Sequence, residues 1–221
     1  SDDHYSTASD LARLTIELIK NHPNHYEIYA ERSFEYNGIA QTNRNKLLWR
    51  DLSVDGVKTG YTKKAGYCLV ASAERDGMRL VSVVLGASSD QDRMKESQKL
   101  LSFGFRNYDT QLLYRANSEI TRLKVFYGKT DAVSIIAPTD VYVTAPRGDL
   151  DLAVTELSVP KHLEAPINKN DVIGSLEVLL AGEDKVMFET EVLAADDITE
   201  ANLFGKVSDF FYLFYSELFG E

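Results

Sequence analysis

The chain has 221 residues and a mass of 24.8 kDa, which allows one large domain or two small ones. Hydrophobic residues make up 44% and charged residues 26%, a balance that argues against a disordered tail, a fibre or a coiled coil. The net charge of −10 argues against nucleic-acid binding, and the single cysteine, Cys68, excludes an internal disulfide and a zinc site built from several thiolates.

The chain opens on a predicted helix and a predicted hairpin. Residues 7–20 place apolar residues at roughly helical spacing, and Thr7 with Asp10 three residues later has the pattern of a capping box. Further along, Asn37-Gly38 is a typical hairpin-turn dipeptide, and the residues around it alternate between apolar and polar. This alternation predicts half-buried strands on either side of the turn.

A second hairpin and a long helix follow. The apolar runs 66–73 and 78–86 flank Asp76-Gly77, another turn dipeptide, and they predict two largely buried antiparallel strands. Residues 89–105 then return to helical spacing. This part of the chain therefore predicts an α+β fold, with helices packed on an antiparallel sheet.

The pattern of the sequence changes after about Tyr108. Short β-like runs separated by turn residues follow at near-regular spacing, which is typical of a small all-β sandwich or barrel. These runs are 121–127, 133–137, 141–144, 150–157, 172–180 and 185–193. We expect a boundary between residues 109 and 117, with a first domain at 1–112 and a β-rich domain at 113–200.

The last stretch, residues 201–221, predicts an amphipathic helix. A helix this rich in phenylalanine either packs on a core or lies in a membrane interface. One lysine against three acidic residues gives residues 203–221 a charge of −2, so attraction to anionic lipid cannot drive binding. The apolar positions on one side are Phe204, Val207, Phe211, Phe214, Tyr215 and Leu218.

One motif in the chain indicates chemistry. Residues 54–62 read VDGVKTGYT and contain Lys58-Thr59-Gly60. In the serine acyl-transfer enzymes that act on β-lactams, a Lys-Thr-Gly motif lies on a sheet strand that borders the active site. Lys58 would bring positive charge to a substrate carboxylate, Thr59 would donate a hydroxyl hydrogen bond to it, and Gly60 would allow close approach. Taken alone, Lys58 is better explained as a solvated strand lysine.

The surroundings of this motif resemble a known family. The runs Asn43–Trp49 (NRNKLLW), 54–62 and Lys64–Tyr67 (KAGY) are similar to those of low-molecular-mass penicillin-binding proteins that are D-alanyl-D-alanine carboxypeptidases. The resemblance extends from about Tyr5 to the end of the chain. It implies the C-terminal part of a serine β-lactamase/transpeptidase-like domain, followed by an all-β sandwich domain and a terminal amphipathic helix.

The resemblance also implies the site residues. Lys58, Thr59 and Gly60 correspond to the third active-site motif of the family and are the expected catalytic residues. Arg44 aligns with an arginine that helps to hold the substrate carboxylate, and Tyr61 and Thr62 complete the expected substrate-binding set with Lys58 and Thr59. Tyr61 stands where close relatives often carry histidine. No metal and no organic cofactor are implied.

The nucleophile is where the chain departs from the family. The family's Ser-x-x-Lys and Ser-x-Asn motifs precede Lys-Thr-Gly, and the 57 residues before Lys58 contain neither. The literal match Ser158–Lys161 lies in the β-rich half, and its Pro160 argues against the helical turn that would bring serine and lysine together. Since both motifs are missing, we expect the chain to be an inactive C-terminal portion of a longer parent.

For the parent, the resemblance implies a serine-type carboxypeptidase that removes the terminal D-alanine of peptidoglycan pentapeptides and is acylated by β-lactams. It further implies a periplasmic protein associated with the inner membrane through its C-terminal helix. Two alternatives stay open. One is a β-lactamase-type hydrolase of the same superfamily, against which the β-rich domain argues, and the other is a non-catalytic cell-wall binding module.

Overall fold

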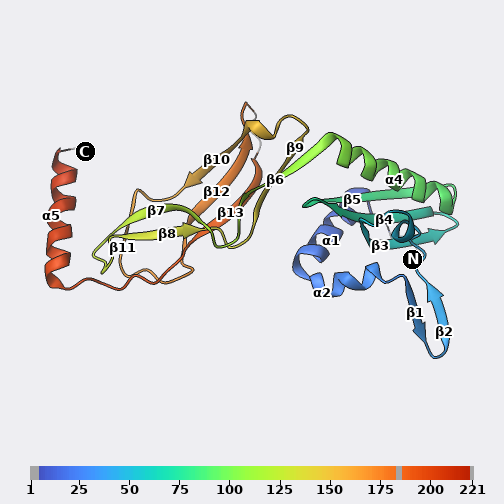
Figure 1. The fold of residues 1–221 in the computed structure, drawn as a ribbon, viewed down its shortest axis with the longest axis horizontal. Coiled ribbons are helices and arrows are strands. Elements are labelled where there is room, and N and C mark those ends of the chain that lie inside the picture. Colours follow the sequence, from blue (N-terminus) through green and yellow to red (C-terminus); the bar gives the residue numbers. More distant parts are fainter. Residues whose placement is uncertain (1–4, 183–185, 220–221) are drawn as a thin grey trace. The chain divides into compact units, whose positions relative to one another are not determined.

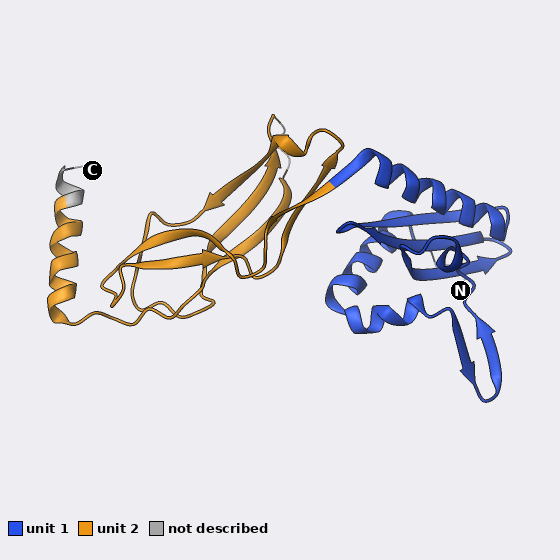
Figure 2. Cartoon of the chain, in the orientation of Figure 1, with its two compact units in different colours: residues 1–109 blue, residues 110–221 orange. Residues whose placement is uncertain are grey.

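The computed structural model describes residues 5–182 and 186–219, and the chain divides into two compact units (Figure 2). Unit 1 comprises residues 1–109 and unit 2 comprises residues 110–221. Each unit buries apolar side chains of its own, with separate clusters in the two halves of the chain. Each unit therefore has the hydrophobic core that defines a domain.

Unit 1 contains a three-stranded antiparallel sheet in the order β3-β4-β5 (Figure 1). Its strands are β3 (Val54–Thr62), β4 (Gly66–Arg75) and β5 (Met78–Ala87). Asp76 and Gly77 connect the last two strands, and their positive φ angles of 49° and 80° are those that a tight hairpin turn requires. The hairpin predicted from the two apolar runs is therefore confirmed.

Helices pack on this sheet. Helix α4 (Asp90–Asn107) contacts β4 and β5, and helix α1 (Ala8–Asn21) contacts β5. Leu69 shares a buried cluster with Leu101 of α4, whereas its neighbour Val70 lies in a second cluster against which side chains of α1 pack. Because successive residues of a strand point to opposite faces, a strand covered on both faces reads as a continuous apolar run.

Helix α1 begins at the predicted capping box. The hydroxyl of Thr7 accepts a hydrogen bond of 3.1 Å from the backbone N–H of Asp10, and the Asp10 carboxylate accepts one of 3.3 Å from the N–H of Thr7. The box satisfies two amide groups that have no partner within the helix. Three short helical segments follow in the connections: α2 (Pro23–Tyr26), η1 (Glu27–Ala30) and α3 (Leu47–Arg50).

The first hairpin has the predicted turn but lacks the predicted burial. Strands β1 (Ser33–Tyr36) and β2 (Ile39–Thr42) pair antiparallel around Asn37-Gly38. Every residue of both strands is exposed, and Phe34 and Tyr36 each expose 67% of their surface. The prediction of half-buried strands is wrong, because no other element of the described chain covers this two-stranded sheet.

Unit 2 consists of two sheets and a terminal helix. The larger sheet has the order β10-β12-β13-β8-β7-β11, and the smaller sheet pairs β6 with β9. Neighbours in the larger sheet run antiparallel, except that β11 lies parallel to β7. The elements are β6 (Tyr108–Tyr114), β7 (Glu119–Phe126), β8 (Ala132–Ile136), β9 (Val141–Pro146), η2 (Leu150–Leu152), β10 (Ala153–Ser158), β11 (His162–Glu164), β12 (Val172–Leu180) and β13 (Val186–Ala194).

The two sheets of unit 2 share one apolar core. Val141 and Val143 of β9 lie in the same buried cluster as Leu176 and Val178 of β12 and Val192 of β13. The alternating burial along β9 and β12 matches a strand with one face toward this core. The predicted small β-sandwich is thereby confirmed.

Helix α5 (Leu203–Phe219) ends the described chain and lies within the predicted stretch 201–221. Its Asp209 carboxylate accepts a hydrogen bond of 2.6 Å from the backbone N–H of Tyr127, and the ring of Tyr212 lies 5.8 Å from that of Phe126. The side chain of Leu218, one of the predicted apolar positions, lies outside the described residues. Within the part of the chain that the structure describes, no helix is long and apolar enough to cross a membrane.

Candidate active site

The Lys-Thr-Gly motif lies on β3 at the edge of the unit 1 sheet. On one side Lys58, Thr59 and Gly60 are in register with Val70, Leu69 and Cys68 of β4. On the other side, β3 has no strand partner among the described residues. A free strand edge presents backbone N–H and C=O groups that an extended peptide can pair with.

The side chain of Lys58 is exposed at this edge. Its Nζ donates a hydrogen bond of 2.7 Å to the backbone carbonyl of the next residue, Thr59. An ammonium group has three donors, so this contact leaves two for an anionic ligand. Gly60 is also exposed, and a Cβ built on it would meet Cys68 only at 3.8 Å, so the sheet itself does not demand a glycine there.

Two buried polar side chains hold the strand on either side of the lysine. Before it, the side-chain amide of Asn45 donates a hydrogen bond of 2.8 Å to the carbonyl of Gly56. After it, the guanidinium of Arg93 donates one of 3.1 Å to the carbonyl of Gly60. Asn45 and Arg93 are 1% and 5% exposed; the bond to Gly56 is buried and the bond to Gly60 is partly buried. The strand segment with Lys58 is therefore fixed at both ends.

The segment that precedes α3 contains Arg44. The carboxamide of Asn43 donates hydrogen bonds of 3.3 and 3.0 Å to the carbonyls of Tyr29 and Glu31, and its oxygen accepts one of 2.9 Å from the N–H of Asn45. Arg44 itself is exposed, and in the described chain it has no hydrogen-bond or ion-pair partner. Its two neighbours are anchored while its guanidinium is left available to a ligand.

Tyr61 and Thr62 lie where β3 turns into β4. Tyr61 pairs across the strands with Tyr67, and the two rings lie 4.3 Å apart at 36°. Thr62 accepts a hydrogen bond of 2.9 Å from the backbone N–H of Ala65, which stabilises the turn. The structure thus gives Thr62 a local role in the turn, and it leaves Tyr61 exposed beside the motif.

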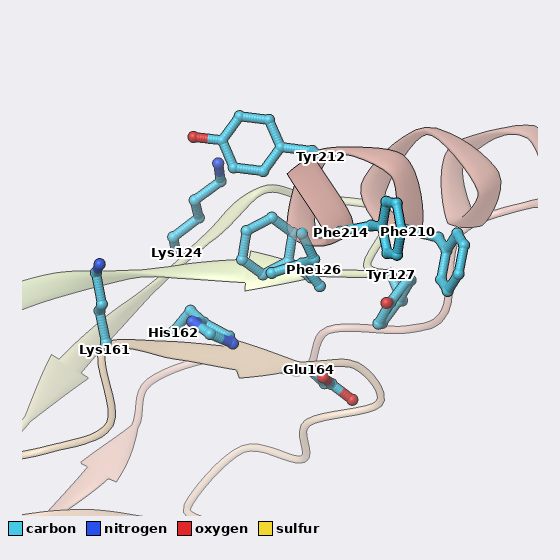
Figure 3. Close-up of a pocket in the computed structure, with 10 residues that line it drawn as sticks. Lys124, Phe126, Tyr127, Lys161, His162, Glu164, Phe210, Tyr212 and Phe214 are labelled. Atoms are coloured by element: carbon cyan, nitrogen blue, oxygen red, sulfur yellow. The ribbon is translucent and has the colours of Figure 1, made fainter. Parts of the chain in front are cut away.

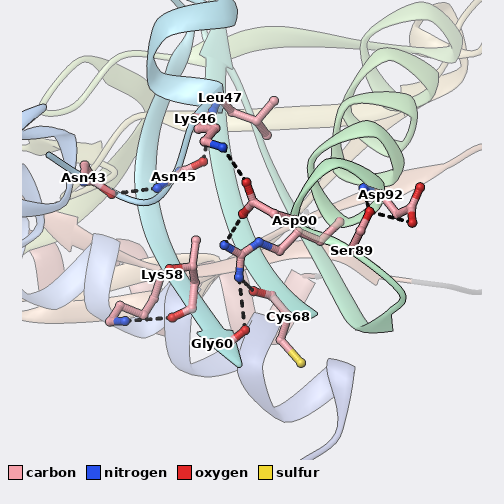
Figure 4. A network of polar contacts seen from close by, with 12 residues as sticks. Asn43, Asn45, Lys46, Leu47, Lys58, Gly60, Cys68, Ser89, Asp90 and Asp92 are labelled. Atoms are coloured by element: carbon pink, nitrogen blue, oxygen red, sulfur yellow. Dashed lines mark hydrogen bonds and ion pairs between the residues drawn. The ribbon is translucent and has the colours of Figure 1, made fainter. Parts of the chain in front are cut away.

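The carboxylate of Asp90 links Lys46, which lies before α3, to Arg93 of α4. Asp90, the first residue of α4, accepts a hydrogen bond of 2.7 Å from Lys46 and forms an ion pair with Arg93 (Figure 4). The bond from Lys46 holds the pKa of the Asp90 carboxyl below its usual range, with partial burial acting against it and Arg93 acting with it. Sequence reasoning identified neither Asp90 nor Arg93 as part of this site.

The literal Ser-x-x-Lys match falls in the other unit of the chain. Ser158 ends β10 and Lys161 lies before β11, so the literal Ser-x-x-Lys match is in unit 2 and not on a helix. A cavity of about 670 Å³ also lies in unit 2, lined by Lys124, Lys161 and aromatic residues of α5 (Figure 3). Among the described residues there is no cluster of three or more His, Cys, Asp or Glu side chains placed to bind a metal ion.

Comparison with known families matches both halves of the chain. Residues 1–89 match the family described as D-alanyl-D-alanine carboxypeptidase. Residues 108–200 match the family described as penicillin-binding protein 5, C-terminal domain. The second match begins at residue 108, next to the boundary between unit 1 and unit 2 at residues 109 and 110.

Individual proteins match over nearly the whole chain. D-alanyl-D-alanine carboxypeptidase DacA of Escherichia coli K12 is 41% identical over 222 residues, covering 100% of this chain and 55% of that protein. DacF of Bacillus subtilis is 33% identical over 210 residues, covering 90% of this chain and 52% of DacF. A crystal structure of penicillin-binding protein 5 from Haemophilus influenzae superposes with a TM-score of 0.74 at 38% identity, covering 90% of this chain and 58% of that one. The chain thus spans about half the length of the curated relatives it matches.

Proposed function

The chain belongs to the low-molecular-mass penicillin-binding D-alanyl-D-alanine carboxypeptidases, and on that premise we propose that it forms the carboxyl-side part of a serine-type D-Ala-D-Ala carboxypeptidase. The substrate class is the peptidoglycan stem pentapeptide, and β-lactams acylate the same enzyme. The observation that supports this most directly is the exposed ammonium of Lys58 on the free edge of β3.

In the proposed reaction the strand edge holds the substrate and another segment attacks it. A serine activated by a lysine, on a segment outside this chain, forms a bond to the penultimate D-alanine carbonyl carbon. The C–N bond to the terminal D-alanine breaks, and the serine proton passes to the leaving amine. Water then hydrolyses the acyl-enzyme and releases the serine.

Lys58 and Thr59 would bind the terminal D-alanine, which is the leaving group of the reaction. The two free donors of the Lys58 ammonium and the Thr59 hydroxyl would bind the terminal carboxylate, and the edge of β3 would pair with the peptide backbone. Arg44 would add a second positive charge near that carboxylate. Orientation of this kind can lower a barrier by about 7–11 kcal/mol at best.

A labelled antibiotic tests this function. The protein that carries this chain together with its nucleophile segment is incubated with fluorescent penicillin and with an N-acylated D-Ala-D-Ala peptide. We expect this longer protein to form a covalent adduct with penicillin and to release D-alanine from the peptide. The 221-residue chain alone should do neither. Failure of the longer protein to form an adduct or to release D-alanine would contradict the proposal. Fast turnover of the penicillin would instead favour a β-lactamase.

The proposal extends to the membrane surface of the periplasm. Helix α5 exposes a series of large apolar side chains, among them Phe204 at 88% and Phe211 at 64%. Such a helix lowers its free energy by burying these rings among lipid acyl chains. We therefore assign α5 to association with the outer face of the inner membrane.

A further inference from the structure

We infer that Arg93 is a positioning residue that sets the geometry of the Lys-Thr-Gly strand, an inference that rests on the proposed function. Arg93 lies in the first turn of α4, and its side chain is only 7% exposed. A buried guanidinium is costly unless its donors are paired. The identity of its partners therefore indicates which part of the fold it holds.

Those partners are at the end of the motif. One nitrogen of Arg93, Nη1, donates hydrogen bonds of 3.1 Å to the carbonyl of Gly60 and of 3.1 Å to the carbonyl of Cys68. Gly60 and Cys68 are cross-strand partners in the β3–β4 ladder. A single charged donor thus ties the two strands together beside the last motif residue. The Gly60 carbonyl belongs to the peptide group between Gly60 and Tyr61, so its direction fixes the plane of that peptide group just after the motif.

Arg93 also lies under the aromatic pair that follows the motif. Its guanidinium carbon is 5.5 Å from the centre of the Tyr67 ring, within the range of a cation–π contact. Tyr67 in turn lies 4.3 Å from the ring of Tyr61, which is 56% exposed. Arg93 therefore supports both the backbone of the strand and the exposed ring beside it.

The other end of the guanidinium is fixed by Asp90. Nη2 of Arg93 pairs with one oxygen of that carboxylate, and Lys46 donates to the other at 2.7 Å (Figure 4). Lys46 is two residues after Arg44, so one carboxylate links the segment of Arg44 to the strand of Lys58. A planar guanidinium can reach several acceptors at once, whereas the single ammonium of a lysine cannot reproduce that fork.

The inference predicts a specific defect in carboxylate recognition. In the enzyme that carries this chain and its nucleophile segment, we compare Arg93→Met and Arg93→Lys with the wild type. The substrates are an N-acylated D-Ala-D-Ala peptide and the same peptide ended by a carboxamide. We expect Arg93→Met to lower kcat/KM for the acid about 100-fold, because a small misplacement of positioning groups costs that much. We expect kcat/KM for the amide to fall only a few-fold. Arg93→Lys should restore part of the ratio of kcat/KM for the acid to kcat/KM for the amide.

Matched variants separate this defect from general damage. Arg106→Met removes an exposed arginine from the same helix and should leave both rates unchanged. If Arg93→Met does not fold, the acid-to-amide ratio of kcat/KM is measured in Tyr67→Leu and Arg93→Lys, which change the packing less. A wild type that prefers the acid, with an unchanged ratio in the Arg93 and Tyr67 variants, would overturn the inference. A wild type that does not prefer the acid would overturn the proposed function itself.

Discussion

The side-chain amide of Asn45 and the carbonyl of Gly56 form a hydrogen bond of 2.8 Å inside unit 1. Asn45 is 1% exposed, and its side-chain oxygen also accepts a bond of 3.2 Å from the N–H of Leu47. The same side chain thus binds the first backbone N–H of α3 and holds β3 two residues before Lys58. The conformation of the Arg44 segment and that of the motif strand depend on one buried amide.

Removing this amide should destabilise unit 1. Asn45→Ala leaves the Gly56 carbonyl and the Leu47 N–H without a partner in a buried place, and such losses cost about 1–3 kcal/mol of unfolding free energy. Urea denaturation of the 221-residue chain measures the change. Asn24→Ala, at an exposed position of α2, is the matched control and should change stability by less than about 0.5 kcal/mol. Equal stability of the two variants would contradict the prediction.

Alkaline pH should destabilise the same unit through Tyr26. Its phenol is 6% exposed and donates a hydrogen bond of 2.6 Å to Asp55. Burial, and then this bond to Asp55, raise the pKa of the Tyr26 phenol well above its usual range. Since the pKa is higher in the folded state, the stabilisation is complete below the unfolded value of about 10 and declines as pH rises toward the folded pKa.

The measurement for Tyr26 is the urea midpoint between about pH 8 and pH 11, a window that spans the unfolded pKa of tyrosine. The wild type should lose stability across the upper part of this range. Tyr26→Phe should be less stable at neutral pH because Asp55 loses a donor, and its midpoint should fall less steeply above about pH 10. Parallel pH profiles for the two proteins would show that Tyr26 does not titrate in this way.

The sequence predicted those elements whose signal is local. The presence of helix α5, the turn at Asp76-Gly77 and the capping box at Thr7 follow from neighbouring residues. Other elements were missed, among them β11, which has three residues and pairs parallel with β7, and β6, which continues directly from α4. Three residues are too few for a periodic pattern, and β6 begins where the helical pattern of α4 ends.

The site was only partly predictable, for the same reason. Lys58 to Thr62 and Arg44 came from a motif and a resemblance, and their roles remain predictions. Arg93 is 33 residues from Gly60 in the chain, so nothing in its local sequence indicates that it binds the motif strand. Burial of the arginine, which is a tertiary property, is what reveals it.

Acid should weaken the link between α4 and the Arg44 segment. The pKa of Asp90 is lowered in the folded state, first by the hydrogen bond from Lys46. Its contribution is therefore present above the unfolded value of about 3.9 and is lost as pH falls through the lower folded value. In urea titrations from about pH 6 down to pH 2.5, the free energy of unfolding of Asp90→Asn should fall less steeply than that of the wild type. Because Asp90 is partly exposed, the difference should be modest.

Lys58 should matter for acylation and not for folding. Its side chain is exposed, so Lys58→Ala should leave the urea midpoint of the chain nearly unchanged. In the enzyme with its nucleophile segment, the same variant should slow acylation by fluorescent penicillin about 100-fold or more, the usual effect of removing one positioned donor. Lys95→Ala, an exposed lysine of α4, serves as control. An unchanged acylation rate in Lys58→Ala would remove this lysine from the site.

Membrane association through α5 should depend on apolar burial. Phe210, Phe211 and Phe214 expose 56, 64 and 54% of their surface, while the charge of residues 203–221 is −2. The chain should therefore sediment with vesicles of neutral phosphatidylcholine, and about 1 M NaCl should not release it, because salt screens charges but not apolar contacts. Deletion of residues 203–221 should abolish sedimentation, and Phe211→Glu should reduce it, since that change moves a charge into the lipid. Binding that needs anionic lipid, or that survives the deletion, would place the contact elsewhere on the chain.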